Sequence, residues 1–385
     1  MLYRILIPRY ARNSVKMDFK SDNIRLEFQY RPLVSAVLAV RNEERYIEAV
    51  LQSLLLQDTL ICDLEIIVVD GDSSDATPEI VKRIARQDGR VKLLVNHQRK
   101  TPYAFNIGIH SAIGQYVCIL GAHTVYSKDY VATCLRELHL HDAGGCSGIE
   151  ITRPSGGGFQ ARLIAWVLAH PFGTSTGSMR TRKAGFADTI PYPIFLKSTL
   201  LEVGSYDTQL HRNQDNDLSQ RLRARGHKLY MTDQTYCEYF VSPTLASLSK
   251  YAFKTGFWNI ISFKRNRSSM SLRHFVPGAF VAGLIACLVA YVFASSVPGQ
   301  VGGWLRLPLL SLIIAYAIAS FGAAFHIASR ERAVIAFLTP LIFFTLHTCY
   351  GAGALAAITI NAQLPGEPSL CPSQAGIHDP STPVL

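Results

Sequence analysis

Hydrophobic residues follow two different patterns along this chain of 385 residues. In the first third, short apolar runs of strand length alternate with stretches whose apolar residues recur at helical spacing. The strand-like runs are residues 34–40, 64–69, 91–95 and 116–120, and the helices are expected at residues 46–56, 78–85 and 103–113. Strands that alternate with helices predict an α/β domain, with a mostly parallel, Rossmann-like sheet that has helices on both faces.

After residue 274 the pattern changes to long apolar stretches with very few charges. The only Asp, Glu, Lys and Arg residues from there to the end are Arg306, Arg330, Glu331, Arg332, Glu367 and Asp379. A helix of about 20 residues crosses a hydrocarbon core about 30 Å thick. Residues 275–295, 307–328 and 333–360 are long enough. Because three such stretches in succession are rare in soluble domains, we expect three C-terminal transmembrane helices.

The basic residues near these stretches predict an orientation. They lie just before the first span and in the turn between the second and third: Lys264, Arg265, Arg267, Arg273, Arg330 and Arg332. The loop of residues 296–304 has no charge. The positive-inside rule therefore predicts a multi-pass membrane protein with residues 1–274 in the cytosol.

Net charge and cysteine spacing exclude several classes of protein. The chain has 38 Lys and Arg against 28 Asp and Glu, a formal charge of +10 at pH 7. Contact with anionic lipid accounts for part of this excess, so we expect no nucleic-acid partner. The eight cysteines form no C-x-x-C pair, which argues against a zinc cluster or a small disulfide framework. No G-x-G-x-x-G follows the first strand, which argues against a dinucleotide cofactor.

Polar residues follow each predicted strand at its carboxyl end, where parallel α/β sheets bind their ligands. In chain order these are Asn42 and Glu43, Asp70 and Asp72, Arg99 and Lys100, and His123. For Asp70, an Asx turn or a helix cap remains an alternative interpretation. A hydrogen-bonded structural residue remains an alternative for His123.

Four segments resemble family 2 glycosyltransferases of the GT-A fold. They are VSAVLAVRNEE (34–44), EIIVVDGDSSDAT (65–77), AFNIGIHSAIGQYVCILGAHT (104–124) and RNQDNDLSQRLRARG (212–226). The three spans and the segment KYAFKTGFWN (250–259) are similar to the succinoglycan glucosyltransferase-like branch, which builds bacterial exopolysaccharides. Each motif alone is weak, but four in the right order are specific.

The resemblance implies an inverting hexosyltransferase that uses a nucleotide-diphosphate sugar and a divalent cation, Mn²⁺ or Mg²⁺. UDP-glucose is the expected donor, and a polyprenyl-linked glycan is the expected acceptor. Asp70 matches the aspartate that reads the nucleotide base, and Asn42 with Glu43 match nucleotide contacts of the first strand. Asp72, Arg99 and Lys100 complete the expected nucleotide-sugar-binding set.

His123 matches the last position of the D-x-D or D-x-H element that holds the cation, so the resemblance implies a metal ligand. Gly121 stands where the family usually has its first aspartate, which is a departure. Metal binding would then depend on His123, substrate oxygens and water. Imidazole suits softer metals than Mg²⁺, so Mn²⁺ is the better match.

Asp215 matches the aspartate of the family's E-D dyad, with Gln214 in place of the glutamate. The resemblance makes Asp215 the catalytic base, because an acceptor hydroxyl becomes a stronger nucleophile as its proton leaves. Capping of the following helix is the alternative. Negative charge grows on the leaving diphosphate, and fixed cations there, with Arg99, Lys100 and Lys254 as candidates, would stabilise it.

These predictions divide the chain into five parts. They are an N-terminal extension (1–32), a GT-A domain (33–243), an amphipathic membrane-interface segment (244–274), three transmembrane helices (275–360) and a tail (361–385). Aromatic residues of the interface segment are expected at the depth of the lipid headgroups. Residues 180–188, together with Tyr192 and Phe195, are expected to contact the acceptor.

The predicted function is transfer of a hexose to a lipid-linked oligosaccharide in exopolysaccharide biosynthesis. Two alternatives remain open. A polyprenyl-phosphate sugar synthase would use the lipid phosphate itself as acceptor. A non-catalytic GT-A-like membrane scaffold of a polysaccharide assembly complex would explain the departures at Gly121 and Gln214.

Overall fold

The computed structural model describes residues 15–18, 25–28, 31–181, 183–210, 212–241, 243–267, 270–294 and 300–359. The predicted tail and most of the N-terminal extension lie outside these residues. Within the extension, β1 (Val15–Asp18) pairs antiparallel with β2 (Arg25–Phe28), a hairpin that the sequence pattern did not predict.

A parallel half of the main sheet carries the predicted strands. Its members are β3 (Leu33–Val40), β4 (Asp63–Asp70), β5 (Val91–Val95) and β6 (Tyr116–Gly121). They lie in the order β5-β4-β3-β6, and all three pairs are parallel. The near-continuous apolar sequences of these strands suit a sheet that is covered on both faces. The predicted α/β fold is therefore confirmed.

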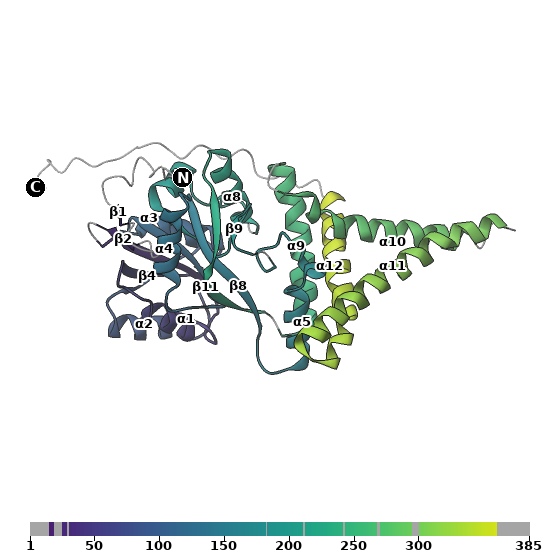
Figure 1. Cartoon of the computed structure of the whole chain (residues 1–385), viewed down its shortest axis with the longest axis horizontal. Coiled ribbons are helices and arrows are strands. Elements are labelled where there is room, and N and C mark those ends of the chain that lie inside the picture. Colours follow the sequence, from purple (N-terminus) through teal and green to yellow (C-terminus); the bar gives the residue numbers. More distant parts are fainter. Residues whose placement is uncertain are drawn as a thin grey trace, which may run out of the picture.

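An antiparallel extension widens the sheet beyond β6. It contains β7 (Thr124–Tyr126), β8 (Gly145–Pro154), β9 (Gly185–Phe186), β10 (Ile194–Leu196) and β11 (Leu229–Val241). β10 runs antiparallel between β6 and β8, whereas β8 and β11 pair in parallel. β7 and β9 add antiparallel pairs to β11. The long strands β8 and β11 lead from this sheet toward the C-terminal helices (Figure 1).

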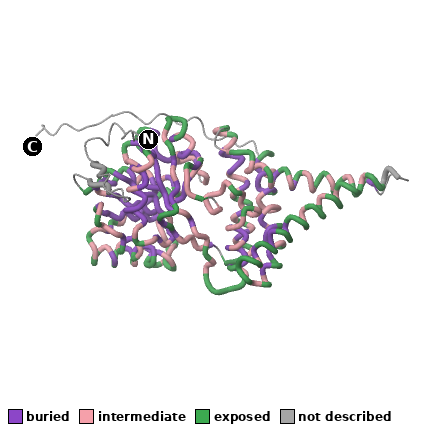
Figure 2. Tube along the Cα trace, viewed as in Figure 1, coloured by how far each residue is buried: buried purple, intermediate pink, exposed green. Residues whose placement is uncertain are grey.

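Helices cover both faces of the sheet. One face packs against α1 (Ile47–Leu55), α2 (Thr77–Gln87) and α4 (Tyr130–Leu140). The other face packs against α3 (Thr101–Ser111), α7 (Lys197–Glu202) and α8 (Gln214–Ala224). The buried residues follow this sheet in Figure 2. The loops at the strand ends lie outside this core and can carry polar residues.

Three C-terminal helices are long and apolar enough to cross a membrane, as the sequence predicted. They are α10 (Val276–Phe293), α11 (Gln300–Glu331) and α12 (Thr339–Thr359). α10 and α11 project together from the rest of the molecule (Figure 1), and much of their surface is exposed (Figure 2). Large apolar side chains such as Val289, Phe293 and Ile318 form this surface, which suits contact with lipid tails.

The predicted interface segment contains one long helix, α9 (Leu245–Arg265), which packs along α12. Glycines allow the close approach, because a Cβ at Gly256 would overlap the Tyr350 carbonyl and one at Gly353 would overlap the Phe253 carbonyl. Small residues serve the same purpose between membrane helices. Short helix α5 (Phe159–Leu168) joins this group through a shared apolar cluster. α9 therefore stands between the sheet and the apolar helices (Figure 1).

Candidate active site

The strand-end residues of β3 and β6 meet in an acid–imidazole pair. Glu43 follows β3 and His123 follows β6, and Glu43 Oε1 lies 3.1 Å from His123 Nε2. The Tyr46 ring packs edge-on against the imidazole, with the ring centroids 5.0 Å apart. Glu43 is mostly buried, whereas His123 remains open to solvent. The Glu43 carboxylate thus fixes the orientation of the His123 imidazole, which stays accessible to solvent.

The loops after β3 and β4 are tied to each other by hydrogen bonds. The Asn42 backbone N–H donates to Ser73 Oγ over 2.9 Å, and Asn42 Oδ1 accepts from the Ser74 N–H over 2.9 Å. Ser73 in turn donates to Asp70 through its N–H over 2.9 Å and through its hydroxyl over 2.5 Å. Asp70 is only 4% exposed. Asp70 therefore stabilises this loop through its hydrogen bonds with Ser73. A turn of this kind is the alternative interpretation that the sequence left open for Asp70.

Asp72 and Arg99 form an ion pair above the ends of β4 and β5. Arg99 Nε donates to Asp72 Oδ2 over 2.9 Å, and a second bond comes from Arg99 Nη2. These hydrogen bonds from Arg99 hold the pKa of the Asp72 carboxyl below its usual value. Both residues have positive φ, 59° and 56°, a conformation that is uncommon outside glycine and concentrates at functional sites. Lys100 follows as the residue before α3.

Gly121 has no room for a side chain. A Cβ there would lie 2.6 Å from Cε1 of Tyr192, closer than real Cβ contacts allow. The aromatic ring thus fills the place in which an acidic side chain would stand. Within the described part of the chain, no three His, Cys, Asp or Glu residues are grouped as a metal site.

Glu43 and His123 lie close enough to hold a divalent cation together. Together they offer one nitrogen and one carboxylate donor, a combination that Mn²⁺ accepts. Cations of this kind commonly take their remaining ligands from substrate phosphates and water. The residues present therefore fit a cation that is shared with a phosphate-bearing substrate. The sequence predicted His123 for this role and Glu43 for the nucleotide only.

Asp215 is the second residue of α8 and is held by Tyr206. The Tyr206 hydroxyl bonds to the Asp215 carboxyl. Tyr206 is itself fixed by Asn106, which accepts the Tyr206 N–H over 2.9 Å and donates to its carbonyl over 2.8 Å. Burial raises the pKa of Asp215 to about 6. The hydrogen bond from Tyr206 acts in the opposite direction and lowers the pKa. Asp215 also keeps solvent-exposed surface, and water there limits the rise.

A polar atom next to Asp215 lacks a partner. Gln214 Oε1 is buried and accepts no hydrogen bond from any residue that the structure describes. An unsatisfied buried acceptor costs about 1–3 kcal/mol, which a bound hydroxyl or amide could recover. Gln214, which stands where the resembling family has a glutamate, thus offers an unpaired hydrogen-bond acceptor beside Asp215.

The structure brings the predicted residues together in two groups. Asn42, Asp70, Asp72 and Arg99 belong to adjoining loops, and Glu43 with His123 form the pair beside them. Asp215 forms no hydrogen bond or ion pair with either set among the described residues. Helix α3 links Asp215 to the strand-end loops. It begins directly after Arg99 and Lys100, and it carries the residues that pack against Tyr206.

Two residues with expected roles in acceptor binding lie in different surroundings. Phe195 belongs to β10, is 1% exposed and packs against Gly145 in the core, so it cannot contact an acceptor. Arg180, in contrast, pairs with a carboxylate. Its Nε lies 2.9 Å from Oε1 of Glu150, a carboxylate that interrupts the apolar pattern of β8. The charge of Glu150 between two isoleucines is the sequence signal that could have identified the pair.

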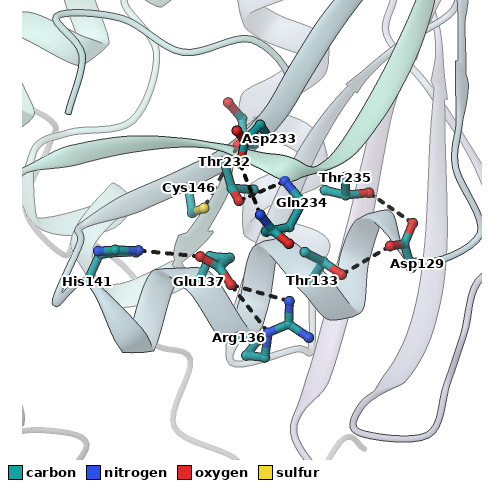
Figure 3. Close-up of polar contacts among 11 residues, drawn as sticks. Asp129, Thr133, Arg136, Glu137, His141, Cys146, Thr232, Asp233, Gln234 and Thr235 are labelled. Atoms are coloured by element: carbon teal, nitrogen blue, oxygen red, sulfur yellow. Dashed lines mark hydrogen bonds and ion pairs between the residues drawn. The ribbon is translucent and has the colours of Figure 1, made fainter. Parts of the chain in front are cut away.

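A separate polar network joins α4 to β11 (Figure 3). Asp129 accepts hydrogen bonds from the Thr235 and Thr133 hydroxyls, over 2.9 and 3.3 Å. Glu137 forms ion pairs with Arg136 and His141 in the same region. The pairing register of β11 shifts between Thr232 and Tyr236. The network therefore fixes the irregular part of this strand, and its polar groups are satisfied within the protein.

Known proteins share sequence with this chain. Residues 35–199 match the family described as Glycosyl transferase family 2. Succinoglycan biosynthesis protein ExoA of Rhizobium meliloti (strain 1021) is 27% identical over 323 residues, which cover 82% of this chain and 92% of that protein.

A second relative acts on a lipid-linked sugar, according to its name. Dolichyl N-acetyl-alpha-D-glucosaminyl phosphate 3-beta-D-2,3-diacetamido-2,3-dideoxy-beta-D-glucuronosyltransferase of Methanococcus voltae is 25% identical over 233 residues, 58% of this chain and 70% of that protein. Among solved structures, mannosyltransferase PcManGT from Pyrobaculum calidifontis, in complex with GDP-Man and Mn²⁺, has a TM-score of 0.53 at 20% identity. That match covers 86% of this chain and 88% of the other, and it shows a shared fold.

The α/β sheet with its polar strand ends, together with these matches, defines the class of protein. Residues 35–199 are similar to family 2 glycosyltransferases, the sheet has the GT-A type of fold, and the chain is a glycosyltransferase.

Proposed function

We propose that this protein transfers a hexose, with inversion, from a nucleotide-diphosphate sugar to a lipid-linked oligosaccharide in exopolysaccharide biosynthesis. UDP-glucose is the proposed donor. The observation that carries the proposal is Asp215, a carboxylate with a raised pKa at the start of α8, next to the vacant acceptor Gln214 Oε1. The similarity to a succinoglycan biosynthesis protein supports the exopolysaccharide context.

The donor would bind along the carboxyl ends of the parallel strands. We assign its nucleotide and diphosphate to Asn42, Glu43, Asp70, Asp72, Arg99 and Lys100, with Asp70 acting through the loop that it fixes. Glu43 and His123 would hold a divalent cation, Mn²⁺ or Mg²⁺, beside the diphosphate. When bound, such a cation neutralises the charge that develops on the leaving group.

Asp215 would act as the base. Its ionised carboxylate takes the proton of the acceptor hydroxyl while that oxygen forms a bond to the anomeric carbon of the donor sugar. The bond from this carbon to the diphosphate breaks at the same time, and the nucleoside diphosphate leaves with the electron pair. Attack opposite to the leaving group inverts the anomeric centre. The hydrogen bond from Tyr206 would orient the carboxylate, and it lowers the pKa of Asp215, which favours the ionised form.

The acceptor would reach this site from the membrane. We propose a multi-pass protein of a bacterial-type inner membrane, with the catalytic domain in the cytosol and α9 at the lipid surface. The three apolar helices and the basic residues that flank them support this arrangement. The name of the Methanococcus voltae relative, which acts on a dolichyl phosphate sugar, supports a lipid-linked acceptor.

A scaffold function is the second candidate, and one observation favours it. The ring of Tyr192 closes the position at Gly121 that carries a carboxylate in the resembling family. A scaffold need not bind donor, so calorimetric titration of the purified protein with UDP-sugars and Mn²⁺ separates the two functions. We expect saturable binding that requires the cation.

A donor screen tests the proposed reaction itself. Radiolabelled nucleotide sugars are incubated with the purified protein, Mn²⁺ and a bacterial membrane extract, and the lipid fraction is counted. We expect label from UDP-glucose to enter that fraction. Transfer from none of the donors, with no heat of donor binding, would overturn the proposal in favour of the scaffold.

A further inference from the structure

Two arginines and two tyrosines meet where the sheet approaches α9. The Arg180 guanidinium carbon lies 4.8 Å from the ring centroid of Tyr239 and 5.9 Å from that of Tyr251. Arg212 approaches the same Tyr251 ring, with its guanidinium carbon 5.2 Å from the centroid. Tyr239 comes from β11, Tyr251 from α9, and Arg212 from the loop before α8. We call this group the arginine–tyrosine seam.

A third arginine borders the seam from the membrane side. Arg273 lies in the short turn Leu272–His274 just before α10. It packs so closely on Gly177 that a Cβ there would overlap its Nη1. Gly177 stands three residues before Arg180, so Arg180 and Arg273 approach the same loop. Arg180 and Arg212 thus share the Tyr251 ring, and Arg273 contacts the loop that carries Arg180.

The seam carries more positive charge than its carboxylate offsets. Glu150 pairs with Arg180, and both side chains are nearly buried, at 3% and 11% exposure. Arg212 is half-buried, and its contacts are the Tyr251 ring and, over 3.4 Å, the Tyr251 carbonyl. No carboxylate among the described residues forms an ion pair with it. An anionic partner stabilises a partly buried cation of this kind, because the free-energy cost of removing the charge from water is otherwise uncompensated.

The seam lies between the proposed base and the helices that could span a membrane. Arg212 precedes Asp215 by three residues, so their Cα atoms lie within about 11 Å. The neighbouring Asn213 side chain donates to Asn259 of α9, and Asn259 donates to the Tyr350 hydroxyl of α12. An anion bound at Arg212 would therefore be close to the catalytic helix and to the membrane helices at once.

We propose that Arg180, Arg212 and Arg273 bind the phosphate or diphosphate of the lipid acceptor. Guanidinium groups suit this task, since their planar fork of N–H donors matches phosphate oxygens. Tyr239 and Tyr251 hold the guanidinium planes in place from their ring faces. The assignment rests on the proposed function, because a lipid-linked acceptor supplies the anion. Its lipid chain would follow α9 and α12 into the bilayer.

Calorimetric titration with farnesyl phosphate tests the proposal on the detergent-solubilised full chain. We expect saturable binding by the wild type and a dissociation constant raised about tenfold to a hundredfold in Arg212→Gln and in Arg273→Gln. Arg212→Lys should recover part of the affinity, because it keeps the charge without the fork. Arg83→Gln, which removes an exposed pair with Glu48, should bind as the wild type does. Equal affinity in the wild type and both glutamine variants would overturn the proposal.

Competition experiments identify the source of the phosphate. Farnesol, which lacks the anion, should not displace farnesyl phosphate, whereas excess inorganic phosphate should. Displacement by farnesol would mean that the lipid chain alone is bound, which contradicts the assignment. Full displacement by phosphatidylglycerol micelles would reassign the seam to ordinary membrane headgroups and overturn it as well.

Donor binding distinguishes failure of this inference from failure of the proposed function. UDP-glucose with Mn²⁺ is titrated into the same proteins, and we expect the wild type and the arginine variants to bind it equally. If the donor binds but the glutamine variants still bind farnesyl phosphate normally, the seam assignment alone fails. If the wild type binds no donor, the proposed function fails, and the assignment that rests on it fails too.

Discussion

The ring of Tyr192 occupies the space in which a side chain at Gly121 would lie, with Cε1 2.6 Å from the position of a Cβ. Tyr192 has a positive φ of 47°, and such a conformation costs about 1–3 kcal/mol outside glycine. Its carbonyl accepts the Tyr130 hydroxyl over 2.9 Å, and its ring packs edge-on against Tyr126. The neighbours therefore hold the tyrosine where a carboxylate would otherwise be.

Placing an acid at residue 121 should harm the protein instead of improving its metal site. We expect Gly121→Asp to lower the free energy of unfolding by about 1–3 kcal/mol, because the new side chain forces the Tyr192 ring out of a packed position. Thermal unfolding in detergent measures this loss. Gly121→Asp should cost less stability when it is introduced into Tyr192→Gly than when it is introduced into the wild type. A single variant as stable as the wild type would show that the ring does not exclude a side chain.

Removing the charge of Asp215 should stop transfer and spare donor binding. We expect Asp215→Asn to lower the rate of transfer about a hundredfold to ten-thousandfold, the contribution of a positioned base. Its affinity for UDP-glucose should be nearly unchanged by calorimetry. A polyprenyl-phosphate sugar synthase predicts a much smaller loss of rate, because a phosphate acceptor needs no strong base.

The raised pKa of Asp215 predicts opposite effects of pH on activity and stability. Activity should rise with pH and level off above about 6, where the carboxylate is ionised. In the unfolded chain the pKa is near 3.8, so the folded state holds the proton more tightly. The contribution of this group to stability therefore falls as the pH rises from about 4 to about 6.

Asp215→Asn consequently should be no less stable than the wild type at pH 7. Thermal unfolding at pH 7 and at pH 4 checks this expectation, and any gain should shrink at the lower pH. A large loss of stability at both values would support the capping interpretation of Asp215 instead.

Removal of the imidazole at residue 123 should weaken the use of Mn²⁺. We expect His123→Ala to raise the dissociation constant for UDP-glucose with Mn²⁺ about tenfold or more. Glu43→Gln should act in the same direction, since Glu43 Oε1 fixes His123 Nε2 over 3.1 Å. His227→Ala, a change two residues before β11, serves as the control. Unchanged donor affinity and metal dependence in His123→Ala would make His123 structural.

The link from the catalytic helix to α12 should be needed for stability. Asn259 is 3% exposed and bridges Asn213 and Tyr350. Asn259→Leu leaves both partners unsatisfied, so we expect a loss of about 1–3 kcal/mol in unfolding free energy and a lower transfer rate. Ser249→Ala, which removes a bond within α9 only, should change neither. Wild-type stability and rate in Asn259→Leu would refute the link.

The parallel half of the fold could be predicted closely from the sequence. The expected strand at residues 91–95 matches β5, and the other three are one residue shorter than the observed strands at one end or at both. β7, β9 and β10 have only two or three residues each, too few to show any periodicity. Their places depend on tertiary pairing.

The same distinction holds for the site. The carboxyl ends of parallel strands share one edge of the sheet, so the sequence predicts that the polar residues after these strands gather there. The pairing of Glu43 with His123 depends on β3 lying next to β6, a neighbour relationship that chain order does not reveal. The contact of Tyr192 with Gly121 joins residues far apart in the chain, so only the folded structure reveals why residue 121 is glycine.

Transfer of label from UDP-glucose to lipid by the wild type and by Asp215→Asn, measured side by side in a membrane extract with Mn²⁺, tests the central claim most directly. The proposed function predicts labelled lipid with the wild type and almost none with the variant, while both proteins bind the donor. Equal labelling by the two proteins, or no labelling by either, would contradict a reaction in which Asp215 activates the acceptor.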